Sequence, residues 1–189
     1  MQKGAAKRLP PEVRSAAILE AAKRLLDRDG LRQFSLEAVA REAGVAASLP
    51  RHYFGSSVEL LTAAAIDVIN DVERTIRSPK PELSMQDRFS AYLDLIQQYP
   101  WAHEIWTRSA EIHPTIDKIV RKSRMRLSEG IFHRHWNDLS TLEQIQARGY
   151  VGFVEASVSD WLEHDCKNRD LVLEAIVYWL TRFSAESSK

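Results

Sequence analysis

Residues 35–54 fix the fold expected for the rest of the chain, and they run Ser35-Leu36-Glu37-Ala38-Val39-Ala40-Arg41-Glu42-Ala43-Gly44-Val45-Ala46-Ala47-Ser48-Leu49-Pro50-Arg51-His52-Tyr53-Phe54. Ser35 is a favourable N-cap, and Glu37 falls in a first turn, where the helix dipole favours an acid. Apolar residues then repeat at the spacing of one helical face. Gly44 can take the left-handed conformation that ends a helix. The stretch therefore predicts a short helix, a tight turn and a second short helix over residues 46–52.

Two short helices around a glycine turn form a helix-turn-helix, whose second helix can enter the major groove of DNA. At these residues the chain resembles the DNA-binding core of the TetR (tetracycline-repressor) family of bacterial regulators. The resemblance spans residues 12–75, and it rests on Val39-Ala40, Ala43-Gly44-Val45, Leu49, Arg51-His52-Tyr53-Phe54-Gly55-Ser56 and Glu59-Leu60-Leu61. It implies an all-α fold, in which an N-terminal three-helix DNA-binding domain precedes a helical-bundle domain for ligand binding and dimerisation.

The composition is that of an ordinary globular protein, with 44% hydrophobic and 28% charged residues among 189. No apolar run approaches the length of a membrane span, and the single Cys166 permits no internal disulfide, so we expect a cytoplasmic protein without a membrane partner. We find no P-loop, dinucleotide-binding turn or nucleophile elbow, and we expect no cofactor and no catalytic residues. His133 and His135 would point to different sides of a helix, so we expect no metal site.

The charge distribution supports a nucleic-acid interface near the N-terminus. Net charge is zero, but residues 1–56 hold ten Lys/Arg and six Asp/Glu, a balance of +4. The remaining residues hold sixteen and twenty, a balance of −4. The positive end therefore coincides with the helix-turn-helix, as an electrostatic footprint for phosphates requires.

Helical patterns continue along the whole chain, and no strand signal appears. We expect an N-terminal arm and DNA-binding domain over residues 1–56, a connecting helix over 57–77, and an effector-binding and dimerisation domain over 78–189. The connecting helix carries more apolar residues than one face needs, so it can pack on both domains. Further helices are predicted from Pro11 to Arg28, from Ser84 to Pro100, from Trp101 to Ala110, from Pro114, from Ser140 to His164 and from Arg169 to Ala185.

The resemblance implies which residues would contact DNA. Ala46, Ala47 and Ser48 occupy the base-facing start of the recognition helix. Arg51 would contact the backbone or a base, and the hydroxyls of Ser35 and Tyr53 would contact phosphate; packing for Tyr53 and a solvated charge for Arg51 are the alternatives.

Two residues depart from the pattern of the resembled family. Pro50 replaces an aliphatic residue, and we expect the first turn of so short a helix to accommodate it. Ser57 replaces a common phosphate-contacting Lys, so that contact is missing. With small side chains at 46–48, methyl contacts, Arg51 and DNA shape would carry more of the specificity.

A two-fold dimer would place two recognition helices about 34 Å apart, one turn of DNA. We expect the last two helices to form its interface, since small residues recur at close-approach spacing and apolar residues flank them. The candidates are Gly149, Gly152, Ala156, Ser159, Ile176, Trp179, Leu180 and Phe183, for each of which a place in the monomer core is the alternative.

Aromatic side chains with polar edges gather in the first part of the second domain and suit a mostly apolar pocket. The candidates for ligand binding are Trp101, His103, Trp106, His113, Trp136, Tyr150 and Phe153, with ordinary core packing as the alternative. The expected partners are therefore a double-stranded DNA operator, a largely apolar small-molecule effector and a second copy of the chain.

The function that these features favour is a ligand-responsive, sequence-specific transcriptional regulator, most often a repressor in the resembled family. Two other classes stay open. An effectorless architectural protein would bind DNA independently of sequence, with a steep salt dependence. A small helical enzyme using His103 or His113 as a base would turn over a substrate without DNA.

Overall fold

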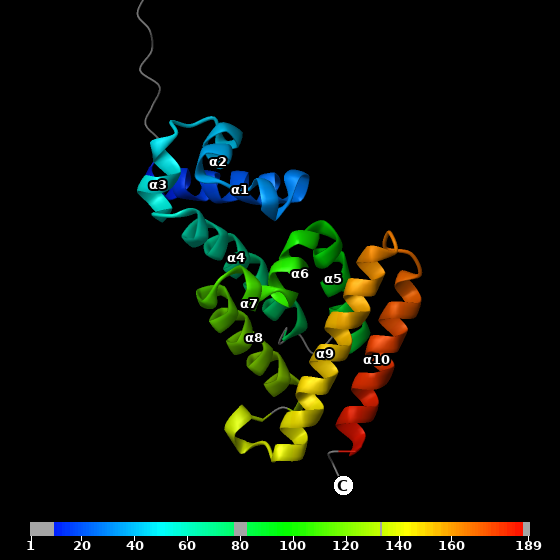
Figure 1. Ribbon diagram of the computed structural model, residues 1–189. Coiled ribbons are helices and arrows are strands. Elements are labelled where there is room, and N and C mark those ends of the chain that lie inside the picture. The colour runs from blue at the N-terminus through cyan, green and yellow to red at the C-terminus, as the bar shows by residue number, and fades with distance from the viewer. Residues whose placement is uncertain (1–9, 78–82, 133, 187–189) are drawn as a thin grey trace, which may run out of the picture. The chain divides into compact units, whose positions relative to one another are not determined.

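The structure is a computed structural model that describes residues 10–77, 83–132 and 134–186, and these residues are helical without any β-strand (Figure 1). The helices are α1 (Pro11–Asp29), η1 (Leu31–Gln33), α2 (Leu36–Ala43), α3 (Ser48–Phe54), α4 (Ser57–Ile76), α5 (Met85–Gln98), α6 (Pro100–Thr107), α7 (Ser109–Ile112), α8 (Pro114–Phe132), η2 (Trp136–Asp138), α9 (Thr141–Glu163) and α10 (Arg169–Glu186). The all-α fold predicted from the sequence is confirmed. Within the described ranges, no helix combines the length and the apolar character that crossing a bilayer requires.

The chain divides into two compact units, and the division falls within α4, between Ala64 and Ala65. The segment predicted to connect two domains, residues 57–77, corresponds to this helix. The sequence Ser78-Pro79-Lys80-Pro81, which reads as a linker between the two domains, lies outside the described residues. Each unit has its own hydrophobic core.

The first unit is built by local signals around the helix-turn-helix. Gly30, at a φ of 70°, ends α1, and its N–H donates to the carbonyl of Leu26 at 2.9 Å. The Ser35 hydroxyl caps α2 by accepting the N–H of Ala38 at 3.1 Å. Gly44, at a φ of 65°, ends α2 in the left-handed conformation, as expected. One apolar core holds α1, α2 and the start of α4 together; its buried members are Ile18, Ala21, Ala22, Leu25, Leu36, Ala38, Val39 and Leu60.

The second unit is a bundle in which the long helices α9 and α10 run side by side (Figure 1). Reciprocal hydrogen bonds between Ser84 and Asp87 and between Ser140 and Glu143 form capping boxes at the starts of α5 and α9. Side chains of α5, α9 and α10 make up most of the core, with Val72 of α4; the buried members are Val72, Phe89, Tyr92, Leu93, Ile96, Tyr150, Val154, Val158, Trp161, Leu173, Ile176 and Leu180.

Two element boundaries differ from those predicted. The single helix expected from Trp101 to Ala110 is two, α6 and α7, because the backbone leaves the helical conformation at Arg108. The second helix of the helix-turn-helix begins at Ser48 and not at Ala46, and it continues through Phe54 to Gly55. Ala47 caps this helix without a side-chain hydrogen bond, so no local signal marked its start.

Candidate DNA-binding and effector-binding sites

The residues that lead into α3 present small side chains on the surface of the first unit. Ala46, Ala47 and Ser48 are exposed, and so is Arg51 one turn further on. Pro50 is buried at the third position of the helix, where its missing N–H removes no intrahelical hydrogen bond. The helix therefore accommodates Pro50 as expected, and the proline anchors the inner side of α3 while the other side is left free.

The two predicted phosphate contacts from hydroxyl groups differ in their surroundings. The Ser35 hydroxyl is half-buried and accepts the Ala38 N–H, so it keeps its own proton for an outside acceptor. Tyr53 is half-buried and packs against the core of the first unit, with its ring 5.2 Å from that of His52 in an edge-to-face contact. Packing and an outward hydroxyl are compatible for a tyrosine.

Five arginine side chains of the first unit fall into two groups. Arg24 and Arg28 both donate to the Glu42 carboxylate, at 3.2 and 2.7 Å, and these bonds lower the pKa of Glu42. Arg32, Arg41 and Arg51 are exposed and pair with no acid in the described part of the chain. Their charges are thus free to meet an anion such as a phosphate group.

The second unit contains a cavity of about 80 Å³ with mostly apolar walls. Four aromatic rings belong to the lining, those of Phe89, Tyr92, Trp106 and Tyr150. The other lining residues are Val68, Ile69, Val72, Ile76, Ile96, Ala102, His103, Leu127, Val151, Val154 and Glu155. An apolar cavity with a few polar groups is the usual form of a small-molecule site.

Hydrogen bonds fix the polar groups of this wall. Glu155 accepts the indole N–H of Trp106 at 2.5 Å and two bonds from Arg124, at 2.7 and 3.1 Å. The His103 ring nitrogen Nε2 lies 2.9 Å from the Ser159 hydroxyl, and burial lowers the pKa of His103. Burial and the nearby Glu155 carboxylate raise the pKa of Tyr92, so its hydroxyl keeps its proton.

The structure brings three of the seven proposed ligand contacts to the cavity, namely His103, Trp106 and Tyr150. Trp101, His113, Trp136 and Phe153 lie outside the lining: Trp101 is buried elsewhere, and Arg148 stacks over Trp136 at 4.8 Å. Sequence reasoning missed Tyr92 and Glu155. Tyr92 follows Phe89 by three residues on one face of α5, and Glu155 is the single charged residue within the stretch 149–159 of α9; both were detectable signals.

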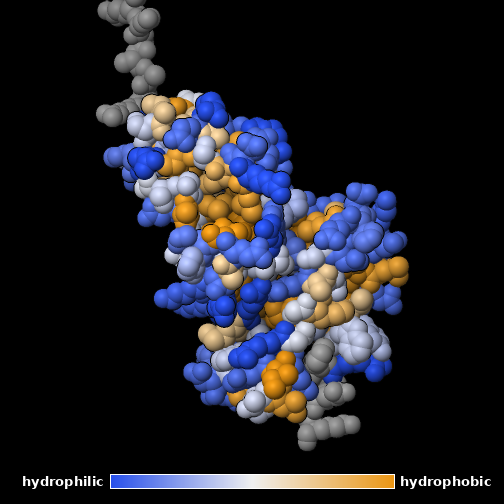
Figure 2. Space-filling model, in the orientation of Figure 1, coloured by the Kyte–Doolittle hydropathy of each residue, from blue (hydrophilic) through white to orange (hydrophobic). Residues whose placement is uncertain are grey.

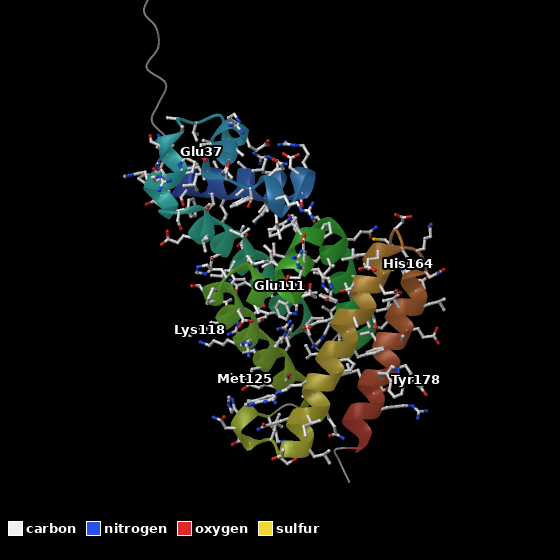
Figure 3. The ribbon with its side chains drawn as sticks, in the orientation of Figure 1. Glu37, Glu111, Lys118, Met125, His164 and Tyr178 are labelled. Atoms are coloured by element: carbon white, nitrogen blue, oxygen red, sulfur yellow. The ribbon has the colours of Figure 1, made fainter. Side chains whose placement is uncertain are left out.

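One side of α9 and α10 leaves small and apolar residues uncovered. Gly149, Gly152 and Ala156 are exposed, and Trp179 is 45% exposed. Tyr178, 47% exposed, projects from α10 (Figure 3), and pale and orange residues interrupt the blue polar surface over these two helices (Figure 2). Ser159 is half-buried, Ile176 and Leu180 are buried in the core, and the side chain of Phe183 lies outside the described residues.

The chain combines a helix-turn-helix unit with a helical bundle, and comparison with known proteins finds the same combination. Residues 18–64 match the family described as bacterial regulatory proteins, tetR family. The HTH-type transcriptional regulator BetI of Vibrio campbellii is 30% identical over 87 residues, which are 44% of this chain and 44% of that protein. The chain thus aligns with less than half the length of this relative.

Solved structures share the fold over nearly the whole chain. A tetR-family transcriptional regulator from Streptomyces coelicolor superposes with a TM-score of 0.76 at 18% identity, covering 94% of this chain and 81% of that one. The multidrug binding protein EbrR in complex with ethidium gives a TM-score of 0.67 at 17% identity, covering 88% and 98%. Residues 18–64 of this protein thus match the tetR family, and the chain as a whole shares the fold of these solved structures.

Proposed function

We propose that this protein is a homodimeric, sequence-specific transcriptional repressor that a small-molecule effector releases from a palindromic operator. Ser35, Ala46, Ala47, Ser48, Arg51 and Tyr53 would contact the DNA. The observation that carries the proposal is the exposed run of Ala46, Ala47 and Ser48 at the start of α3, with the exposed and unpaired Arg51 one turn further on. A helix that is exposed on one side and anchored on the other can lie in a major groove.

Selection of bound sequences from random duplex DNA tests both the specificity and the assembly. We expect an enriched palindrome whose half-sites are about one helical turn apart, since each chain supplies one recognition helix. Enrichment without a palindrome, or no enrichment with binding that only follows the salt concentration, would contradict the proposal.

The role of Arg51 is tested by Arg51→Ala in a gel-shift titration on the selected operator. We expect the affinity to fall about tenfold or more, because the variant loses an uncompensated charge at the DNA. Arg24→Ala is the matched control: Arg24 is also exposed in the same unit but pairs with Glu42 at 3.2 Å, so its removal should change the affinity little. Equal effects of the two variants would remove Arg51 from the interface.

The proposed dimer contact uses the exposed side of α9 and α10. A Cβ added at Gly149 or Gly152 would meet nothing within 4 Å in the described part of the chain, so the packing of the monomer does not require glycine there. Each glycine costs a helix about 1 kcal/mol relative to alanine, which a close approach of another helix can offset. The exposed Trp179 supplies apolar area beside this stripe.

Light scattering tests the contact with Ala156→Arg, which places a long charged side chain in the stripe. We expect a monomer, with operator binding lost in parallel. Lys118→Glu, an exposed change on α8 (Figure 3), should leave the dimer intact. A dimer that survives Ala156→Arg would place the interface elsewhere.

The cavity of the second unit is the proposed effector site. EbrR, which shares the fold, has been solved with imidazole, ethidium and proflavin. By analogy a ligand in the cavity of this chain would favour one conformation, and it can weaken DNA binding only if its affinity differs between the two states. A ligand that binds the protein without changing its affinity for the operator would contradict this part of the proposal.

A further inference from the structure

The proposed function leaves the chemistry of the effector open, and the polar groups of the cavity wall limit it. The lining contains one carboxylate, one imidazole and two phenol groups, and everything else that faces the space is aliphatic or aromatic, apart from the indole N–H that Glu155 occupies. Whether a charged ligand can bind depends on how far the protein already compensates Glu155 and His103.

Glu155 is compensated within the protein. Arg124 donates to both of its oxygens and Trp106 to one, and the side chains of Arg124 and Glu155 are 30% and 19% exposed. A cationic ligand would lose its hydration shell on entry and meet a carboxylate that Arg124 already pairs and that already accepts three hydrogen bonds. An anionic ligand would lose its hydration too, and the described residues of the lining include no Lys or Arg to pair with it.

His103 adds no positive charge to the wall. It is 5% exposed, and Ser159 occupies its Nε2 at 2.9 Å. Since burial lowers the pKa of His103, the imidazole is neutral at neutral pH. The cavity therefore carries no uncompensated charge of either sign.

One polar group of the wall stays unused. Tyr150 donates its hydroxyl proton to the carbonyl of Ile176 at 3.0 Å, whereas the Tyr92 hydroxyl makes no hydrogen bond to another described residue. Tyr92 is 8% exposed and lines the cavity, so a ligand oxygen there would meet a free donor.

The size and shape of the cavity limit the size and shape of the effector. Its volume of about 80 Å³ is close to half that of a cavity of about 150 Å³ that holds benzene in another protein, so one ring is the size that modest side-chain movement can admit. Four aromatic rings in the wall favour a flat partner. On the basis of the proposed function, we propose that the effector is a neutral, single-ring aromatic compound whose hydroxyl or carbonyl oxygen bonds the Tyr92 hydroxyl.

Three probes that share a ring and differ in charge test this class: benzyl alcohol, benzylammonium and benzoate, each titrated into the full chain at neutral pH with ligand-observed NMR. We expect benzyl alcohol to bind about tenfold tighter than either ion, because neither ion recovers its hydration in the cavity. Equal or tighter binding of an ion, or no binding of benzyl alcohol at millimolar concentration, would overturn the proposal.

Variants locate the binding. Tyr92→Phe should weaken benzyl alcohol about fivefold and leave toluene, which has no oxygen, unchanged. Tyr99→Phe, outside the lining, is the control and should change neither. A loss of both ligands in Tyr92→Phe, or of neither, would overturn the role of the hydroxyl. Operator binding measured on the same preparation separates the two ideas, since a protein that binds its operator but not benzyl alcohol refutes only the ligand class.

Discussion

Glu73 forms the most protected ion pair between α4 and α8 of the second unit, and its removal gives a sharp test of how much such contacts stabilise this bundle. Arg126 Nε lies 2.9 and 3.1 Å from the two Glu73 oxygens, and Arg126 Nη2 and the Ser123 hydroxyl also donate to this carboxylate. The side chain of Glu73 is 14% exposed and that of Arg126 is 29% exposed, while Ser123 is fully buried.

Glu73→Gln keeps the size of the side chain and removes its charge, leaving the Arg126 guanidinium uncompensated. Breaking a fully buried ion pair costs about 3–5 kcal/mol, and breaking a surface pair costs about 0–1 kcal/mol. Because Arg126 is partly exposed, the cost of breaking this pair should lie between the cost for a buried pair and the cost for a surface pair. The carbonyl of the introduced glutamine can also still accept one hydrogen bond. We therefore expect the free energy of unfolding of the second unit to fall by about 2 kcal/mol.

Urea denaturation followed by tryptophan fluorescence measures this change in the right part of the chain, since all five tryptophans lie in the second unit. Asp71→Asn is the matched control: it lies on the same helix and pairs with Arg74, but these side chains are 35% and 76% exposed. We expect Asp71→Asn to cost less than about 0.5 kcal/mol. Equal costs for the two variants would refute the argument from burial.

Three further predictions rest on single residues. Ser35→Ala removes the N-cap of α2 and should destabilise the first unit by about 1 kcal/mol, measured by circular dichroism during denaturation. Burial lowers the pKa of His103 below its usual 6.5, so the contribution of the neutral imidazole to stability is present above pH 6.5 and is lost as the pH falls through the lowered pKa. The urea midpoint of the protein should therefore be lower at pH 5.5 than at pH 7.5, about one unit either side of 6.5, and His103→Gln should make this difference smaller. An unchanged difference would contradict the prediction. Asp165, between α9 and α10, has a φ of 54°, which a β-branched residue rarely adopts and glycine adopts freely. Asp165→Val should therefore lower the free energy of unfolding by more than about 1 kcal/mol, whereas Asp165→Gly should not. Equal urea midpoints for the two variants would contradict strain at this position.

Helices and their starts could be predicted from the sequence where one side chain makes the decisive bond. Ser35, Ser84 and Ser140 each accept the backbone N–H three residues on, and this contact depends only on neighbours in the chain. The start of α3 lacks such a group, because its N-cap is Ala47, and the predicted helix was displaced by two residues. The break at Arg108 likewise has no glycine or proline to announce it.

The lining of the cavity could be predicted only in part, because it depends on which faces of separate helices meet. His103 and Trp106 come from α6 and Tyr150 from α9, and their rings suggested a pocket from composition alone. Trp136 has the same ring chemistry but lies on η2, where Arg148 covers it. No local pattern distinguishes these positions, since the assignment is made by tertiary packing.

The short side chains that begin α3 have a consequence for changing what the protein binds. Ala46, Ala47 and Ser48 offer few hydrogen bonds of their own, so a longer residue there would introduce a new preference and sacrifice little of an old one. Because Pro50 fixes the opposite side of the helix in the core, the backbone that would display such a residue is already held in place. If the proposed function holds, these positions are therefore a suitable starting point for redirecting the protein to a chosen DNA sequence.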